Sequence, residues 1–221
     1  MIISPSRRFV FVHIPKTGGT ALTLALESRA RADDILIGDT PKAQARKRRL
    51  AALTPAGRLW KHSTLADVAG VVPEDLSDWF ILTLVRNPWD RVLSYYHWLQ
   101  AQSFNHPAVH LAKSLAFSAF LNDPTTRAAF AKWPAAAYTR DATGVDRVTL
   151  AARVEQLEVE LLPIWHHLGF RLTIPRANES DRPRDWRPAY SDADAALVAT
   201  LCAEDISRFG YSFDGLFMQK G

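Results

Sequence analysis

The chain has 221 residues, 48% of them apolar and 23% charged, which is typical of one globular domain. Its net charge of +4 suits an anionic ligand without requiring nucleic acid, and no stretch approaches the roughly 18 uncharged apolar residues of a membrane span. Arg7 and Arg8 argue against a secretory signal, and Cys202, the only cysteine, excludes an intrachain disulfide and a cysteine-based metal site. We therefore expect a cytoplasmic protein with a single domain over residues 1–221 and no integral membrane segment.

The first element is expected at residues 9–14, where the apolar run FVFVHI reads as a strand buried on both faces. The loop PKTGGT follows at 15–20. Behind it, Ala21, Leu24 and Ala25 have the spacing of one helix face. The start of the chain therefore predicts a strand, a glycine-bearing loop and a helix.

The next part, residues 40–77, reads as short helical pieces broken by prolines and a glycine. It contains the densest basic run, KAQARKRR at 42–49. We interpret this run as a solvated helix face or loop, with an anionic acceptor or a membrane surface as the alternative.

A second buried strand is expected at residues 78–85, DWFILTLV, directly before another helix. Asn87 is a good N-cap, Pro88 suits the first helical position, and Asp90 lies in the first turn, where the helix dipole favours it. Two strand-to-helix junctions of this kind predict an α/β fold with a mainly parallel sheet. In such folds, ligands bind at the carboxyl ends of the strands.

The remainder reads as mainly helical. Helices are expected at 114–123, at 150–170 with a kink or break at Pro163, and at 191–210 between the N-cap Ser191 and the stop Gly210. The polar, proline-rich stretch 175–191 between the last two is expected to be a loop.

The first loop differs from the nucleotide-triphosphate P-loop, in which the lysine follows the glycines. Here Lys16 precedes both Gly18 and Gly19. The amides of Thr17 to Thr20 at a helix start suit one terminal phosphate group. The threonine hydroxyls can add hydrogen-bond donors to this group, and Lys16 can add a positive charge. We therefore expect this loop to hold a single phosphate-like group.

The second junction predicts another anion contact. The strand ends in Arg86, a cation where a magnesium-dependent enzyme would place an acid, and Ser94 lies two turns into the helix. Arg86 and Ser94 can meet a second phosphate, although a structural ion pair between Arg86 and Asp90 is the alternative. Together the two loops indicate a nucleotide with separated anionic groups and no obligatory metal.

The sequences HIPKTGGT and LVRNPWDRVLSYYHW resemble the two signature motifs of the sulfotransferases that use 3′-phosphoadenosine 5′-phosphosulfate. The resemblance is strongest to the carbohydrate (heparan and chondroitin type) branch and its bacterial relatives, and it implies a three-layer, P-loop-like α/β fold. It continues more weakly through VEQL at 154–157, NES at 178–180 and FGY at 209–211. It thus spans most of the chain and implies a carbohydrate or glycolipid-like acceptor.

Carried over by position, the resemblance implies that the 5′-phosphosulfate is bound by the first motif and the 3′-phosphate by Arg86 and Ser94. The family's loop over the adenosine and 3′-phosphate carries a hydroxyl and a basic residue after an asparagine. Here these are Ser180 and either Arg182 or Arg184, a choice that the sequence leaves open. The first motif comprises Lys16, Thr17, Gly18, Gly19 and Thr20.

Sulfuryl transfer to a hydroxyl needs stabilisation of the leaving phosphate, which Lys16 can provide, and a general base. His62, just before a probable helix between the two motifs, is the best candidate, and the resembling enzymes place a catalytic histidine in the corresponding segment. Glu74 and Asp67 are weaker alternatives, and His13 at the strand end is more plausibly structural.

Other features are interpreted more simply. His106 and His110 have metal-ligand spacing, but Pro107 lies between them and no carboxylate cluster accompanies them, so we expect no metal. Tryptophans are expected mainly in the core, with Trp98 and Trp133 as possible linings of an acceptor cleft.

Two other functions remain as alternatives. One is a small kinase that uses ATP through an atypical P-loop, which would need magnesium-binding acids at the strand ends. The other is a nucleotide-binding module without catalysis. Preference for adenosine 3′,5′-bisphosphate over ATP discriminates against the kinase, and turnover discriminates against the module.

Overall fold

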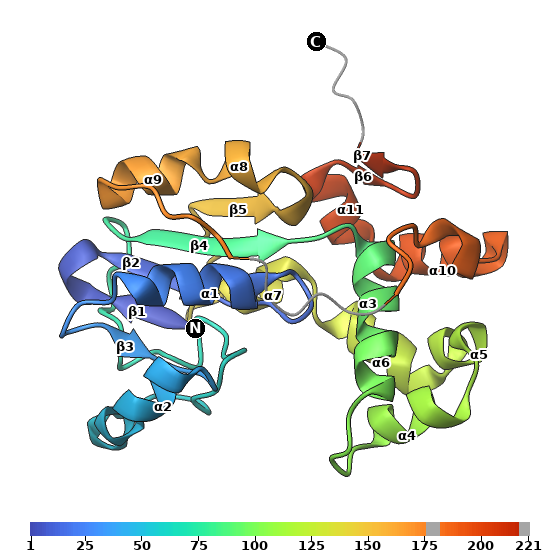
Figure 1. Ribbon diagram of the computed structural model, residues 1–221, viewed down its shortest axis with the longest axis horizontal. Helices are drawn as coiled ribbons and strands as arrows, with labels where there is room; N and C mark the ends of the chain where they lie inside the picture. Colours follow the sequence, from blue (N-terminus) through green and yellow to red (C-terminus); the bar gives the residue numbers. More distant parts are fainter. Residues whose placement is uncertain (176–181, 217–221) are drawn as a thin grey trace. The chain divides into compact units, whose positions relative to one another are not determined.

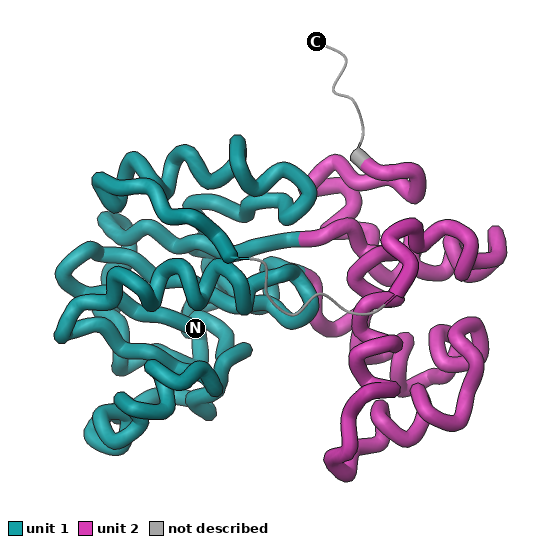
Figure 2. The backbone as a smooth tube through the Cα atoms, viewed as in Figure 1, with its two compact units in different colours: residues 1–85, 135–178 teal, residues 86–134, 179–221 magenta. Residues whose placement is uncertain are grey.

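The computed structural model describes residues 1–175 and 182–216. It divides into two compact units, coloured separately in Figure 2: residues 1–85 with 135–178, and residues 86–134 with 179–221. Each unit is built from two stretches of chain, so the chain passes between the units three times. The single domain over 1–221 stays a prediction.

The first unit is built on a five-stranded sheet of order β3-β1-β2-β4-β5 (Figure 1). β2, β4 and β5 pair in parallel, whereas β1 is antiparallel to both β2 and β3. Four strands therefore run in one direction, and the sheet is mainly parallel. The strands are β1 (Ile2–Ser4), β2 (Phe9–Val12), β3 (Ile35–Leu36), β4 (Phe80–Val85) and β5 (Leu150–Arg153).

The central strands are apolar throughout because both of their faces are buried. Every residue of β2, and every residue of β4 after the first, is buried, and successive side chains of a strand point to opposite faces. Phe11 and Leu84 belong to a core cluster that includes residues of α1 (Gly19–Ser28) and α9 (Leu162–Leu168). β4 also contacts α7 (Ala135–Thr139). The two predicted strands and the helix after the glycine pair are confirmed.

The predicted helix at 150–170 is wrong in its first part. Leu150–Arg153 forms the edge strand β5, which pairs with Leu82–Val85 of β4. The sequence LAAR favours a helix, but pairing with a buried neighbour overrides local propensity. The helical remainder is divided into α8 (Leu157–Glu160) and α9, with Pro163 in the first turn of α9, where proline is tolerated.

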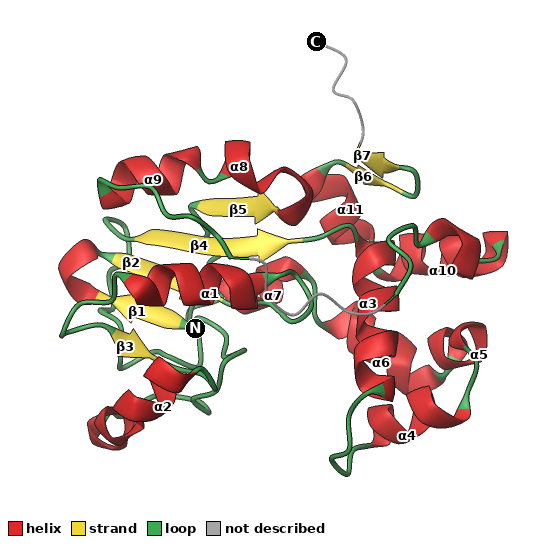
Figure 3. Cartoon of the chain, viewed as in Figure 1, coloured by secondary structure: helices red, strands yellow, loops and turns green. Residues whose placement is uncertain are grey.

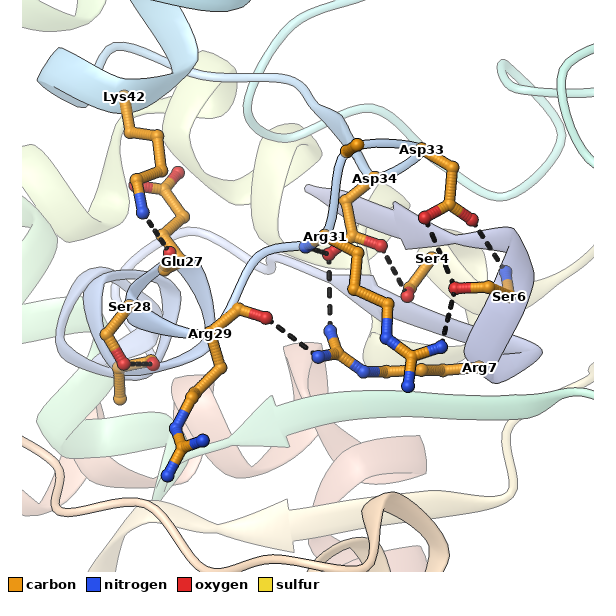
Figure 4. A network of polar contacts seen from close by, with 12 residues as sticks. Ser4, Ser6, Arg7, Glu27, Ser28, Arg29, Arg31, Asp33, Asp34 and Lys42 are labelled. Carbon is orange, nitrogen blue, oxygen red and sulfur yellow. Dashed lines mark hydrogen bonds and ion pairs between the residues drawn. The ribbon is translucent and has the colours of Figure 1, made fainter.

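A polar network joins the end of α1 to β1 (Figure 4). Asp34 is 2% exposed and accepts hydrogen bonds from Ser4 Oγ at 2.5 Å, a guanidinium nitrogen of Arg7 at 3.2 Å and the amide of Arg31 at 2.8 Å. A second guanidinium nitrogen of Arg7 donates to the carbonyl of Arg29 at 2.7 Å. One buried carboxylate therefore holds the turn after α1 against the sheet.

The basic run lies on α2 (Pro41–Arg46) and the 3-10 turn after it, Lys47–Ala52. Three of its cations donate to main-chain oxygens at the end of α1 or in the following turn, at 2.6–2.7 Å: Lys42 to Glu27, Arg46 to Arg31 and Arg49 to Ala32. These three side chains therefore stabilise the same turn as Asp34.

The second unit is mainly helical (Figure 3). Its apolar core includes a cluster around Trp89 and Val198 and another around Tyr96 and Phe120. Its elements are α3 (Pro88–Gln100), α4 (Pro107–Ser114), α5 (Phe117–Asn122), α6 (Pro124–Lys132), α10 (Asp192–Leu201), α11 (Ala203–Phe209) and the hairpin β6 (Tyr211–Ser212) and β7 (Gly215–Leu216).

Two predicted helix starts of this unit are confirmed, whereas the helix expected over 114–123 starts later, as α5 at Phe117, because Ser114 ends α4. The Asn87 side chain accepts a hydrogen bond from the Trp89 amide at 3.1 Å, and Ser191 caps α10. Gly210 ends α11 in the left-handed conformation, with φ of 66°. The helix expected over 191–210 is divided at Cys202, which is buried, and this burial raises the pKa of its thiol to about 12.

The fold is thus α/β, with a mainly parallel central sheet flanked by helices, as the sequence predicts. None of the helices within 1–175 and 182–216 has the length and apolar character needed to cross a bilayer.

Candidate functional site

The loop after β2 has an unusual backbone. Lys16 has a φ of +65° and Gly18 one of +76°, so two left-handed residues flank Thr17. This conformation costs a residue other than glycine about 1–3 kcal/mol, and such strain gathers at functional sites. Main-chain N–H groups in turns of this kind form concavities that bind anions, and the N-terminus of the ten-residue helix α1 adds its dipole. The loop is therefore suited to an anionic group.

The two threonines of the loop differ in their surroundings. Thr17 is buried, and its hydroxyl donates to the carbonyl of Ile14 at 2.9 Å. Its side chain therefore braces the loop, and its amide is the group left to contact an anion. Thr20 lines a cavity of about 10 Å³, with His13 and Lys61 among the other lining residues, which is close to the space of one water molecule.

Gly19 allows the close packing of His13 against the start of α1. A Cβ atom at Gly19 would lie 2.2 Å from Cδ2 and 2.5 Å from Nε2 of the His13 ring, closer than real Cβ contacts come. His13 is only 6% exposed and stacks on Phe11. Burial lowers the pKa of its ring well below the usual value, with repulsion from His62 as a smaller cause. His13 thus has the structural surroundings that its place in the sequence predicts.

His62 lies beside the same strand end. Its Nδ1 is 2.7 Å from the main-chain oxygen of His13, and its ring stands edge-on to His13 at 4.7 Å and to Trp60 at 5.1 Å between centroids. A carbonyl can only accept, so Nδ1 carries the proton and Nε2 is the acceptor. Burial lowers the pKa of His62 to about 4, partly offset by the bond to the carbonyl. His62 is therefore a neutral proton acceptor near neutral pH.

The two alternative bases have other surroundings. Asp67 accepts from the Thr64 amide at 2.7 Å, while the Asp67 amide donates to the Thr64 hydroxyl at 3.1 Å. This reciprocal pair shapes a turn. Glu74 is exposed. Of the three candidates, His62 is the one whose side chain contacts the residue leading into the loop.

The second anion contact expected from the sequence lies in the second unit. Nε and one terminal nitrogen of Arg86 each lie 2.6 Å from Oδ2 of Asp90, and the other terminal nitrogen, Nη1, lies 3.4 Å from Oγ of Ser94. Arg182 donates to Oδ1 of the same carboxylate. The ion pair weighed as an alternative for Arg86 is present, and it coexists with the contact to Ser94.

The other residues expected near the 3′-phosphate are Ser180, Arg182 and Arg184, and the structure treats them differently. Arg184 is exposed, whereas the side chain of Arg182 is 5% exposed and joins Arg86 through Asp90. Ser180 lies outside the described residues. The structure thus brings Arg182, and not Arg184, into the cluster around Arg86.

His106 and His110, the pair with metal-ligand spacing, form hydrogen bonds within their own segment of the chain. His106 caps α4 by accepting from the Ala108 amide at 3.1 Å, and His110 bonds the Asn105 side chain at 2.8 Å. Over the part of the chain that the structure describes, no three His, Cys, Asp or Glu side chains are grouped to hold a metal ion.

Sequence reasoning missed two features of these sites. Asp90 was expected only as a helix-dipole residue or a partner of Arg86, but it binds two arginines. Its spacing of four residues from Arg86 was the one feature of the sequence that indicated such contacts. Trp60, expected in the core, is 44% exposed beside His62, and the guanidinium of Arg58 lies 5.7 Å from its ring centroid. No pattern in the sequence marked Trp60 as exposed.

Comparison with known proteins identifies the family of the chain. The model of the sulfotransferase family matches residues 1–215, nearly the whole chain. Among curated proteins, no match was found. Because the family match covers both anion-contact regions and both units, we conclude that this chain belongs to the sulfotransferase family and is a transferase of sulfuryl groups.

Proposed function

We propose that the protein transfers the sulfuryl group of 3′-phosphoadenosine 5′-phosphosulfate to an acceptor hydroxyl or, as a less favoured option, an amine. The observation that carries this proposal is the left-handed loop of Lys16 and Gly18 at the start of α1 in a chain of the sulfotransferase family. The loop offers donors for one phosphate-like group. No metal is part of the proposal.

In this proposal, the amides of Thr17 to Thr20 and the ammonium group of Lys16 bind the 5′-phosphosulfate. Gly18 allows the left-handed backbone of this loop, and Gly19 leaves room for the His13 ring beside it. Arg86, Ser94 and Arg182 bind the 3′-phosphate, because guanidinium groups give charge-assisted hydrogen bonds to phosphate oxygens. Ser180 and Arg184 remain candidates from the resemblance alone.

The chemical step requires one proton acceptor and one stabiliser of negative charge. The bond from sulfur to the leaving 5′-phosphate oxygen breaks as the acceptor oxygen bonds to sulfur. The proton of the acceptor hydroxyl passes to Nε2 of His62, while Lys16 stabilises the charge that develops on the leaving phosphate. The contact from Nδ1 of His62 to the His13 carbonyl supports this assignment because it leaves Nε2 unprotonated.

We propose a carbohydrate or glycolipid-like acceptor. The exposed ring of Trp60, edge-on to His62 at 5.1 Å, supports this class because sugars stack on aromatic faces. This places an apolar surface next to the proposed base.

Calorimetric titration with adenosine 3′,5′-bisphosphate, with ATP as comparison and EDTA present throughout, tests the two-phosphate site. Tight binding of the bisphosphate with weak binding of ATP is expected. A preference for ATP that appears only with magnesium would replace the proposal with a kinase.

Lys16→Ala tests the chemical role of the loop. We expect release of adenosine 3′,5′-bisphosphate from the sulfuryl donor, measured with a panel of hydroxyl acceptors, to fall by at least about 100-fold. Lys47→Ala removes an exposed lysine and serves as the control. Unchanged turnover of Lys16→Ala with an intact fold would contradict the assignment, and wild-type binding without turnover would favour a non-catalytic module.

A further inference from the structure

Asp90 is the centre of the arginine cluster in the second unit. It is 7% exposed, and both of its carboxylate oxygens are used: Oδ2 by two nitrogens of Arg86 and Oδ1 by Arg182. A buried carboxylate with two guanidinium partners does more than neutralise the positive charge of one arginine. It connects two side chains that are 96 positions apart in the sequence.

The contacts of Asp90 determine how Arg86 is oriented. A guanidinium group is planar, so fixing its edge of Nε and Nη2 on one carboxylate oxygen also fixes the direction of Nη1. This third nitrogen lies 3.4 Å from Oγ of Ser94, one helical turn beyond Asp90. Two hydrogen-bond donors of different side chains are therefore held side by side.

We propose that Asp90 is a positioning residue of the 3′-phosphate site: it aligns Arg86 with Ser94 and ties Arg182 to the same site. This inference rests on the proposed function, in which Arg86, Ser94 and Arg182 contact that phosphate. Asp90 itself does not bind the nucleotide, because two anions repel each other. Its effect is to present the arginines in a ready orientation, which spares the ligand the cost of ordering them.

The opposite role makes the opposite prediction. If Asp90 only occupied the arginines and had to give them up, its removal would strengthen binding of a 3′-phosphate. If it positions them, its removal weakens binding. The sign of the change therefore decides between the two roles.

A matched control lies on the same helix. Arg91, next to Asp90 in α3, forms an ion pair at 3.8 Å with Asp205 of α11, and these side chains are 12% and 10% exposed. Asp205→Asn therefore weakens another buried ion pair of α3 without touching the proposed phosphate contacts. This variant therefore measures how the weakening of a buried ion pair affects the second unit in general.

The experiment compares the dissociation constants of adenosine 3′,5′-bisphosphate and adenosine 5′-phosphate, measured by calorimetry for the wild type, Asp90→Asn and Asp205→Asn. The ratio of the two constants isolates the contribution of the 3′-phosphate. We expect Asp90→Asn to lower this preference about tenfold by weakening affinity for the bisphosphate, with little change for the monophosphate. Asp205→Asn is expected to keep the wild-type ratio within about twofold.

A structural effect alone would change the denaturation midpoint of both variants and leave both ratios unchanged, which would overturn the proposal. A higher ratio in Asp90→Asn would also overturn it, in favour of the competitor role. Asp90→Glu is the second variant should Asp90→Asn not fold: it keeps the charge but moves the carboxylate, so a severalfold lower ratio is expected and a wild-type ratio would count against positioning. A wild type without preference for the bisphosphate would refute the 3′-phosphate site and the role of Asp90 with it, whereas a wild-type preference that survives in Asp90→Asn would refute the role of Asp90 alone.

Discussion

At the scale of single residues, the state of His62 follows from one hydrogen bond and from burial. The carbonyl of His13 fixes the proton on Nδ1, and burial keeps the ring neutral by lowering its pKa to about 4. The same His13 ring packs on Gly19 at the end of the loop of Lys16, where α1 begins. The proposed base and the loop thus share a neighbour, and each is sensitive to how His13 is placed.

The variant His62→Asn separates the structural role of His62 from its proposed role as the general base. The asparagine amide can replace Nδ1 as donor to the His13 carbonyl, but it has no acceptor nitrogen in place of Nε2. We expect an intact fold, nearly unchanged affinity for adenosine 3′,5′-bisphosphate, and turnover lower by about 10²–10⁴-fold. Wild-type turnover in this variant would leave the base to be sought among Asp67 and Glu74.

At the scale of elements, the end of α1 is held by polar contacts more than by apolar packing. Asp34 receives donors from β1, from the turn after β1 and from its own turn, while cations of the basic run bind carbonyls nearby (Figure 4). These contacts fasten the carboxyl end of the helix whose other end begins at the loop of Lys16. The basic run therefore has a structural use that its charge alone does not reveal.

Asp34→Ala tests this anchoring. Removing the buried carboxylate leaves the Arg7 guanidinium and the Ser4 hydroxyl without their partner, and we expect a loss of about 3–5 kcal/mol in the free energy of unfolding. Asp33→Ala, next to it but exposed, removes only the exposed contacts to Ser6 and is expected to change the denaturation midpoint far less. Equal effects in chemical denaturation would show that the network contributes little.

At the scale of the whole molecule, the proposed ligand contacts are distributed over both units. The loop of Lys16 and the ring of His62 belong to the first unit, whereas Arg86, Ser94 and Arg182 belong to the second. The chain passes directly from β4 to Arg86, so the boundary between the units falls at the residue proposed to meet the 3′-phosphate.

The pH dependence of stability is a property of the whole chain. His13 and His62 both have lowered pKa values in the folded protein, so the unfolded state binds protons first as the pH falls below about 6.5. Their stabilising effect is complete above that pH and is lost as the pH falls toward 4. We expect His62 to account for a decrease of about 2 kcal/mol between pH 7 and pH 5, measured by urea denaturation.

A single variant identifies the source of this decrease. His62→Asn is expected to reduce the difference between pH 7 and pH 5. The same difference in His62→Asn and in the wild type would mean that His62 is not the source of the decrease.

The sequence by itself determined the features that depend on local chemistry. The apolar runs of β2 and β4, the glycine pair before α1 and the Asn87 and Ser191 caps follow from side-chain size, backbone freedom and hydrogen bonding within a few residues. The two phosphate motifs also lie within single local junctions. That is why the fold class and the family could be predicted without coordinates.

Only the tertiary structure decided the features that depend on distant partners. LAAR at 150–153 became a strand because β4 offered a partner, and Arg182 joined Arg86 because Asp90 binds both. The protonated nitrogen of His62 depends on a carbonyl 49 residues away. Pairing, burial and hydrogen bonds across such separations are set by packing of the chain, and no local pattern in the sequence encodes them.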